Sequence, residues 1–132
     1  MTQEEKIEYV KYRLESSHNT FQAAKVLAEN GFWNSAVNRL YYSIFYAVNA
    51  LLVMNDIQIK SHTATKSLFS LHFVKTGKLD KKYGRLLSQL YDWRQKGDYG
   101  NVFDYDSSSV RPLFEPVQEM ILLIEKEINK AL

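Results

Sequence analysis

One arginine stands among apolar residues at a position where a helix would turn it inward. Tyr83, Leu87 and Leu90 recur at spacings of three and four residues, and Arg94 continues the same stripe. A guanidinium is almost never buried without a partner, because removing its charge from water costs several kcal/mol. We therefore expect Arg94 either to form an ion pair with Asp98, one turn further on, or to point toward a phosphate group or a partner subunit.

A line of polar residues runs along a second, otherwise apolar helical pattern. Asn38, Tyr42, Tyr46 and Asn49 fall on this line, within a helix predicted over residues 33–54. Such a line is most often a polar seam between two helices. The alternative is that it faces the Arg94 helix and forms part of a cleft or a dimer interface, because tyrosine suits half-buried surfaces.

Histidine is a further candidate, because its pKa near 6.5 allows proton transfer at neutral pH. Ser61 is a suitable N-cap, so we expect His62 at a helix N-terminus, where a phosphate can bind; an ordinary exposed residue is the alternative. His18 and His72 lie elsewhere in the chain and are assigned no role. Three histidines so scattered, in a chain without cysteine, do not form a metal site, and we expect neither a metal nor a cofactor.

Helices must position these residues, because apolar side chains recur with a helical period along most of the chain. The pattern predicts a last helix running to the C-terminus and, before it, helices over residues 2–29, 33–54 and 62–75, and one from 81 to about 96 or a little beyond. Gly31 and Gly77 are stop signals, whereas Pro112 and Pro116 leave the start of the last helix open. Short connections predict an all-α, up-and-down antiparallel bundle of four to five helices, with the 33–54 helix at its centre.

Length, charge and hydropathy exclude several classes of protein. The length of 132 residues predicts one domain, residues 1–132, with a substantial core. The net charge of +2 indicates no broad basic surface for nucleic acid, although it is compatible with a local basic cleft. The N-terminus lacks signal-peptide features, and residues 47–54, the most apolar stretch, fall far short of the about 20 residues that span a bilayer. We therefore expect a soluble, cytoplasmic protein with no membrane partner.

Two segments of the chain resemble a known family. NRLYYSIFYAVNALL begins at residue 38, and SHTATKSLFSLHFVKTGKLDKKYGRLLSQLYDWRQKGDY covers residues 61–99. Together they resemble the HEPN domain, most closely the small stand-alone HEPN proteins of bacteria and archaea. The resemblance implies a four- or five-helix bundle that commonly forms a homodimer. It also implies activity as a ribonuclease or toxin, often with a minimal nucleotidyltransferase as the antitoxin.

The resemblance further implies a site, from which this chain departs at one residue. Family members use an arginine followed, four to six residues later, by a histidine, and both subunits contribute to one cleft. Arg94 matches the arginine, but Tyr99 stands at the position after a four-residue gap, and residues 95–101 contain no histidine. Tyrosine, with a pKa near 10, and aspartate, with a pKa near 3.9, are weaker bases at neutral pH than histidine. The resemblance therefore carries over a phosphate-binding arginine better than a catalyst.

Three hypotheses for function follow from these residues and from the resemblance. The first is a HEPN-type protein that binds RNA or a nucleotide within a toxin–antitoxin-like pair with a nucleotidyltransferase. The second is a metal-independent endoribonuclease in which Arg94 acts with Asp98 and Tyr99. The third is a partner of a nucleotidyltransferase that binds protein only, with Arg94 at the interface. The predicted ligand-binding residues around Arg94 are Asn38, Tyr42, Tyr46, Asn49 and His62.

Overall fold

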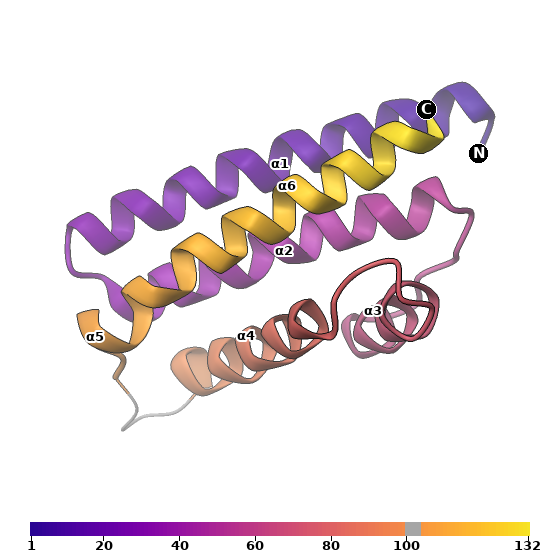
Figure 1. Cartoon of the computed structure of the whole chain (residues 1–132). Coiled ribbons are helices and arrows are strands. Elements are labelled where there is room, and N and C mark those ends of the chain that lie inside the picture. The colour runs from indigo at the N-terminus through magenta and orange to yellow at the C-terminus, as the bar shows by residue number, and fades with distance from the viewer. Residues whose placement is uncertain (100–103) are drawn as a thin grey trace.

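A computed structural model of the chain describes residues 1–99 and 104–132, apart from the side chain of Tyr99. The described residues form helices joined by short connections, without a strand among them (Figure 1). This confirms the predicted all-α bundle. The elements in chain order are α1 (Gln3–Glu29), α2 (Trp33–Met54), α3 (His62–Phe69), the π-helical turn η1 (Ser70–Val74), α4 (Lys81–Tyr99), α5 (Ser107–Val110), the 3₁₀ turn η2 (Arg111–Leu113) and α6 (Phe114–Ala131).

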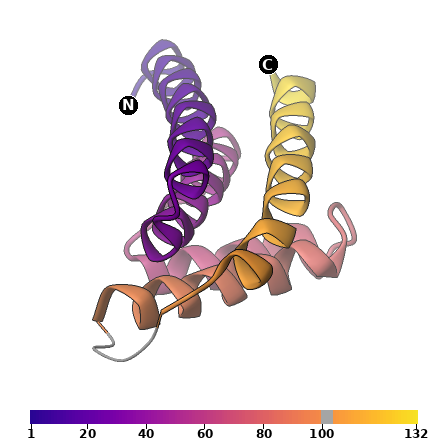
Figure 2. The same cartoon turned by 90° about the vertical axis from the view of Figure 1, so that its left-hand side faces the viewer.

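The long helices α1, α2 and α6 lie side by side, and α4 crosses them. α1 runs antiparallel to α2 and α6, so the two chain termini lie at the same end of the molecule (Figure 1). α2 contacts α1, α4 and α6, and most of its residues are buried, as expected for a central helix. Figure 2 shows α4 running across the direction of α1 and α6. This crossing brings the inward face of α4 against the first half of α2.

Most helix boundaries follow from local sequence signals. Thr2 caps α1 in a capping box with Glu5, and Gly77 adopts a φ of 80° between η1 and α4. The predicted 62–75 helix changes to a π-helical turn at Ser70, whereas α4 ends at Tyr99, a little beyond residue 96 as the prediction allowed. Pro112 lies in η2 and Pro116 in the first turn of α6, so neither proline removes a hydrogen bond from a helix interior.

The core is mostly apolar, and the few buried polar side chains lie where helices contact one another. Leu40, Ile44 and Leu51 of α2 are fully buried in it. Between α1 and α2, the buried hydroxyl of Ser17 donates a 2.6 Å hydrogen bond to a carbonyl of α2, which satisfies it within the core. Among the described residues Arg94 is the one charged side chain that is buried, with 9% of its surface exposed.

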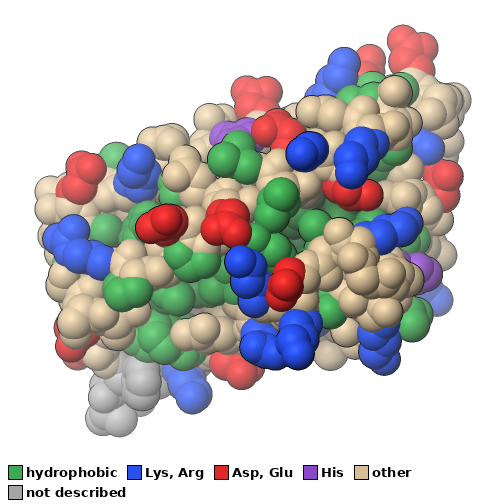
Figure 3. Space-filling model, in the orientation of Figure 1, with side chains coloured by type: hydrophobic (Ala, Val, Ile, Leu, Met, Phe, Trp, Pro, Cys, Tyr) green, Lys and Arg blue, Asp and Glu red, His purple; other side chains and the backbone are tan. Residues whose placement is uncertain are grey.

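The surface shown in Figure 3 carries charges of both signs. Lys and Arg side chains are interspersed there with Asp and Glu side chains, around a band of apolar side chains. This face therefore presents no broad basic surface, in line with the net charge of +2. Within the part of the chain that the structure describes, no helix combines the length and the hydropathy that crossing a membrane requires.

Candidate functional site

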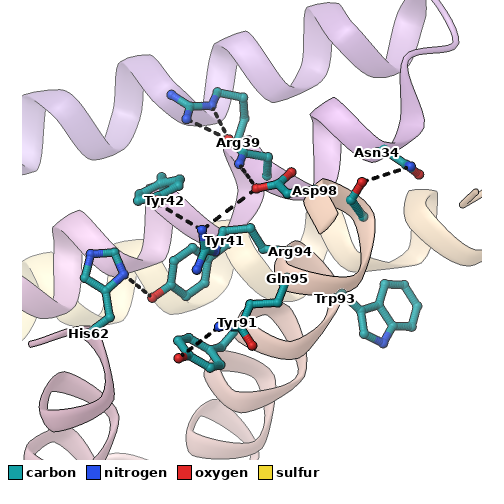
Figure 4. A network of polar contacts seen from close by, with 12 residues as sticks. Asn34, Arg39, Tyr41, Tyr42, His62, Tyr91, Trp93, Arg94, Gln95 and Asp98 are labelled. Atoms are coloured by element: carbon teal, nitrogen blue, oxygen red, sulfur yellow. Dashed lines mark hydrogen bonds and ion pairs between the residues drawn. The ribbon is translucent and has the colours of Figure 1, made fainter. Parts of the chain in front are cut away.

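Arg94 points from the inward face of α4 into a group of tyrosines (Figure 4). Its guanidinium carbon lies 5.2 Å from the ring centre of Tyr41, 5.6 Å from that of Tyr42 and 5.9 Å from that of Tyr91. Each cation–π contact at such distances stabilises the cation by roughly 0.5–2 kcal/mol. The tyrosine rings therefore stabilise the buried charge, but they supply few hydrogen-bond acceptors.

The hydrogen bonds of Arg94 are correspondingly incomplete. Its Nη1 donates to the hydroxyl of Tyr42 at 3.4 Å and lies 3.8 Å from Oδ2 of Asp98. Both distances exceed the about 2.7–2.9 Å of a strong charge-assisted hydrogen bond. The buried Nε has no hydrogen-bond partner among the described residues. Asp98 instead accepts a 2.9 Å hydrogen bond from Nδ2 of Asn38. The predicted ion pair exists, but it leaves the guanidinium with unused donors.

A second arginine borders the same group. Arg39 donates to Oδ1 of Asn38 from Nε at 2.9 Å and from Nη2 at 2.6 Å, and its guanidinium carbon lies 5.1 Å from the ring centre of Tyr42. Asn38 therefore connects Arg39 to Asp98, since its amide nitrogen donates to that carboxylate. Sequence reasoning assigned no role to Arg39. Its position inside the NRLYYSIF segment was the available signal.

His62 lies on the other side of these tyrosines (Figure 4). Its Nδ1 is 3.3 Å from the hydroxyl of Tyr41, and its ring centre is 4.3 Å from that of Phe45 and 6.0 Å from that of Tyr42. Burial lowers the pKa of His62 below its ordinary value, and the positive charge of Arg94 lowers it further. The imidazole is therefore neutral at physiological pH and half-buried at the start of α3.

Tyr41 is the central member of the group and was not among the predicted site residues. Its ring is fully buried and contacts the rings of Tyr42, Tyr91 and His62, with centres 5.0, 5.9 and 6.1 Å away. Burial raises the pKa of Tyr41 well above its ordinary value, against the opposing effect of Arg94. The hydroxyl therefore stays protonated and both donates and accepts hydrogen bonds. The sequence pattern assigns this residue to the apolar face of α2. Only the packing reveals that Tyr41 also contacts Arg94 and His62.

The polar line of α2 divides between two neighbours. Its first half faces the Arg94 group. Further along, the ring centre of Tyr46 lies 5.9 Å from that of Tyr42 and 5.1 Å from the guanidinium carbon of Arg13 on α1. Asn49 accepts a 2.8 Å hydrogen bond from the hydroxyl of Tyr9, so it belongs to the seam between α1 and α2. The predicted residues that the structure brings together are Arg94, Asp98, Asn38, Tyr42 and His62.

The end of α4, which carries the arginine and the aspartate, is held by Tyr105. Its ring stacks on Trp93 with centres 4.7 Å apart, and its hydroxyl donates a 2.9 Å hydrogen bond to the carbonyl of Trp93. Burial raises the pKa of Tyr105 to about 12, so the hydroxyl remains a donor at physiological pH. Asn34 of α2 accepts from the backbone N–H of Tyr105 at 2.8 Å. A Cβ at Gly97 would approach the Tyr105 ring to 3.2 Å, so glycine permits this packing.

The chemistry of the site is that of a guanidinium, phenols, an amide, a carboxylate and an imidazole. These groups bind an anion by charge and hydrogen bonds, stack on a base, and transfer a proton. Over residues 1–99 and 104–132, no three His, Asp or Glu side chains form a group that could hold a metal ion. The side chain of Tyr99, predicted as a catalytic residue, lies outside the described part of the structure.

Comparison with known proteins identifies the family of this bundle. A model of the HEPN domain matches residues 10–128. A UPF0332 protein of Thermotoga maritima is 33% identical, over 98% of this chain and 96% of its own length. Two proteins of Methanocaldococcus jannaschii, named "Putative toxin MJ0605" and "Putative toxin MJ0142", are 36% and 35% identical. They align over 70% and 65% of this chain and over 69% and 58% of their own lengths. The resemblance drawn from the sequence is confirmed, and this chain belongs to the HEPN domain family.

Proposed function

We propose that this chain binds the phosphate of RNA or of a nucleotide through Arg94, as one member of a toxin–antitoxin-like pair with a nucleotidyltransferase. The observation that carries the proposal is the incomplete pairing of the buried guanidinium, whose Nε has no partner and whose Nη1 makes only long contacts. A buried charge with unused donors destabilises a fold, so its presence calls for a function. Phosphate oxygens are acceptors that match the guanidinium fork.

The residues around Arg94 favour a nucleic acid over a simple anion. Tyr42 and Tyr46 are half-buried, and partly exposed tyrosine rings can stack on unpaired bases, each base stack being worth about 1–3 kcal/mol. Arg39 adds a second cation beside Tyr42. With a net charge of only +2, binding rests on these local contacts rather than on a broad electrostatic field. Single-stranded RNA is therefore the ligand to test first.

We expect Arg94→Ala to weaken binding of a labelled single-stranded RNA by at least about tenfold, because it removes the principal phosphate contact. The same substitution lowers the slope of log affinity against log salt by about one. Asp98→Asn should strengthen binding several-fold, because it removes a negative charge 3.8 Å from the guanidinium. Fluorescence anisotropy measures both effects when the salt concentration is varied from roughly 50 to 200 mM, the range over which phosphate contacts weaken strongly.

The matched control is Arg85→Ala, which removes a charge from the exposed side of the same helix. This variant should bind RNA like the wild type. Equal RNA affinity of wild type and Arg94→Ala would contradict the proposal. If the wild type binds no RNA or nucleotide, the hypothesis of a purely protein-binding partner replaces it. Reduced RNA cleavage by Asp98→Asn, without tighter binding, would support the endoribonuclease in which Asp98 is catalytic.

The toxin-like role is supported by the names of the two Methanocaldococcus jannaschii relatives. We expect this chain to be a homodimer at micromolar concentration and to co-purify with a co-expressed minimal nucleotidyltransferase from the same genome. Light scattering after size-exclusion chromatography measures the first property, and affinity purification of one tagged partner measures the second. A monomer at micromolar concentration would contradict a cleft shared between two subunits. Separate elution of the two proteins would contradict the pairing.

A further inference from the structure

The tyrosines around Arg94 also hold a histidine from another helix. Tyr41 and Tyr42 contact the Arg94 guanidinium, with ring centres 5.2 and 5.6 Å from its carbon. The same two rings contact the imidazole of His62, with centres 6.1 and 6.0 Å apart (Figure 4). Arginine and histidine therefore share two neighbours, although 31 residues lie between His62 and Arg94 in the sequence. No spacing rule applied to the residues after Arg94 would find this histidine.

The packing fixes the orientation of the imidazole. Phe45 covers one side of the ring at 4.3 Å between centres, and Nδ1 faces the hydroxyl of Tyr41 at 3.3 Å. This hydroxyl can accept a hydrogen bond from Nδ1–H, and in that tautomer Nε2 carries the free lone pair. His62 itself remains partly exposed. The arrangement presents an oriented proton acceptor beside a phosphate-binding arginine.

We propose that His62 is the general base of an RNA cleavage reaction at this site. The proposal rests on the RNA binding by Arg94 proposed above. His62 stands in for the histidine that is absent from residues 95–101. It is a better base at neutral pH than either Asp98 or a tyrosine, because the ordinary pKa of histidine lies closest to the working pH.

The reaction proceeds by transfer within the RNA strand. Nε2 of His62 takes the proton of a 2′-hydroxyl while the 2′-oxygen forms a bond to the adjacent phosphorus. The bond from phosphorus to the 5′-oxygen breaks, and the leaving oxygen keeps the electron pair and takes a proton from water. His62 then releases its proton to the hydroxide so formed. The products are a 2′,3′-cyclic phosphate and a 5′-hydroxyl, and Arg94 stabilises the negative charge that develops on the phosphoryl oxygens.

The groups that face His62 set the pH dependence of this step. The rings of Tyr41 and Tyr42 of α2 contact the imidazole, and Arg94 of α4 contributes a positive charge. Lys66, one turn further along α3, lies over the ring of Tyr91 at 4.2 Å. Burial and, after it, the positive charge of Arg94 disfavour the imidazolium and thus lower the pKa of His62. Cleavage should therefore rise with pH through this lowered pKa and level off above it.

The test is single-turnover cleavage of a 5′-labelled single-stranded RNA in EDTA. We expect the wild type to produce cyclic phosphate ends, and His62→Gln to reduce the rate by about 10²–10⁴-fold. RNA affinity should change by less than about threefold, because the base acts on the transition state. The matched control His72→Gln alters a half-buried histidine of η1 and should cleave like the wild type. An RNA with 2′-deoxyribose at the cleavage position should remain intact.

A second measurement separates proton transfer from a structural role. Added imidazole should restore cleavage by His62→Ala, and the restored rate should follow the pKa of free imidazole. The proposal is overturned if the wild type binds RNA without cleaving it, or if His62→Gln cleaves at the wild-type rate; in both cases the proposed RNA binding stands. If the wild type binds no RNA, the proposed function fails together with this inference.

Discussion

We expect Arg94→Met to raise the free energy of unfolding by about 1–3 kcal/mol and to abolish RNA binding at the same time. Methionine has nearly the length of the arginine stem and no charge to desolvate. It also removes the unpartnered Nε, which is buried among apolar rings. The loss of the cation–π contacts with three tyrosines opposes this gain, but methionine retains favourable contacts with aromatic rings.

Urea denaturation followed by circular dichroism measures this effect. The transition midpoint should rise while the slope stays unchanged, because the compactness of neither state is altered. Arg85→Met is the matched control, since it makes the same change at an exposed position of α4 and should shift stability by less than about 0.5 kcal/mol. A clear loss of stability in Arg94→Met would mean that Arg94 is mainly a structural residue, held by the tyrosines and Asp98.

We expect Tyr105→Ala to lower the free energy of unfolding by about 3–5 kcal/mol and also to weaken RNA binding. The substitution removes a buried ring stacked on Trp93 and the hydrogen bond to its carbonyl. It also leaves a void against Gly97, so the last turns of α4 lose their support. RNA binding falls as a consequence, because this part of α4 carries Arg94 and Asp98.

Tyr105→Phe is the matched variant, because it keeps the ring and removes only the hydroxyl. It should lower stability by about 1 kcal/mol and leave RNA affinity unchanged. Both quantities should be measured below the melting temperature of Tyr105→Ala, so that unfolded protein does not reduce the binding signal. RNA affinity of Tyr105→Ala equal to that of the wild type would show that the end of α4 keeps its position without this residue.

The helices were largely predictable because each depends on local signals. The apolar circumference of α2 predicted its central place, and residues 33–54 match its observed bounds. The π-helical turn η1 was not predictable, because its altered hydrogen bonding leaves no mark on the apolar pattern around Phe69 and Phe73. The crossing of α4 was missed for a similar reason. Periodicity identifies which face of a helix is buried, but not the angle at which that face meets its neighbour.

The candidate site was partly predictable from conflicts between residue type and pattern. Arg94 on an apolar stripe was such a conflict, and the structure places it among tyrosines with incomplete hydrogen bonds. Tyr41 presented no conflict, because an aromatic residue on an apolar face is ordinary. Asn49 shows that one polar line can have two different neighbours. It shares the polar line with Asn38, but its neighbour is Tyr9 of α1, and no spacing within α2 distinguishes the two neighbours.

The buried ring of Tyr41, which Arg94 contacts over the ring and His62 contacts at the hydroxyl, also bears on the entropy of binding. A free arginine side chain has about 2 kcal/mol of rotamer entropy, and a surface arginine loses this entropy when it binds a ligand. Arg94 is already immobilised against the tyrosines when the chain folds. Its side-chain entropy is therefore lost on folding and not on binding. A ligand therefore meets a guanidinium and an imidazole at a fixed separation. The entropy of its binding should be less unfavourable than that of a ligand held by mobile surface arginines.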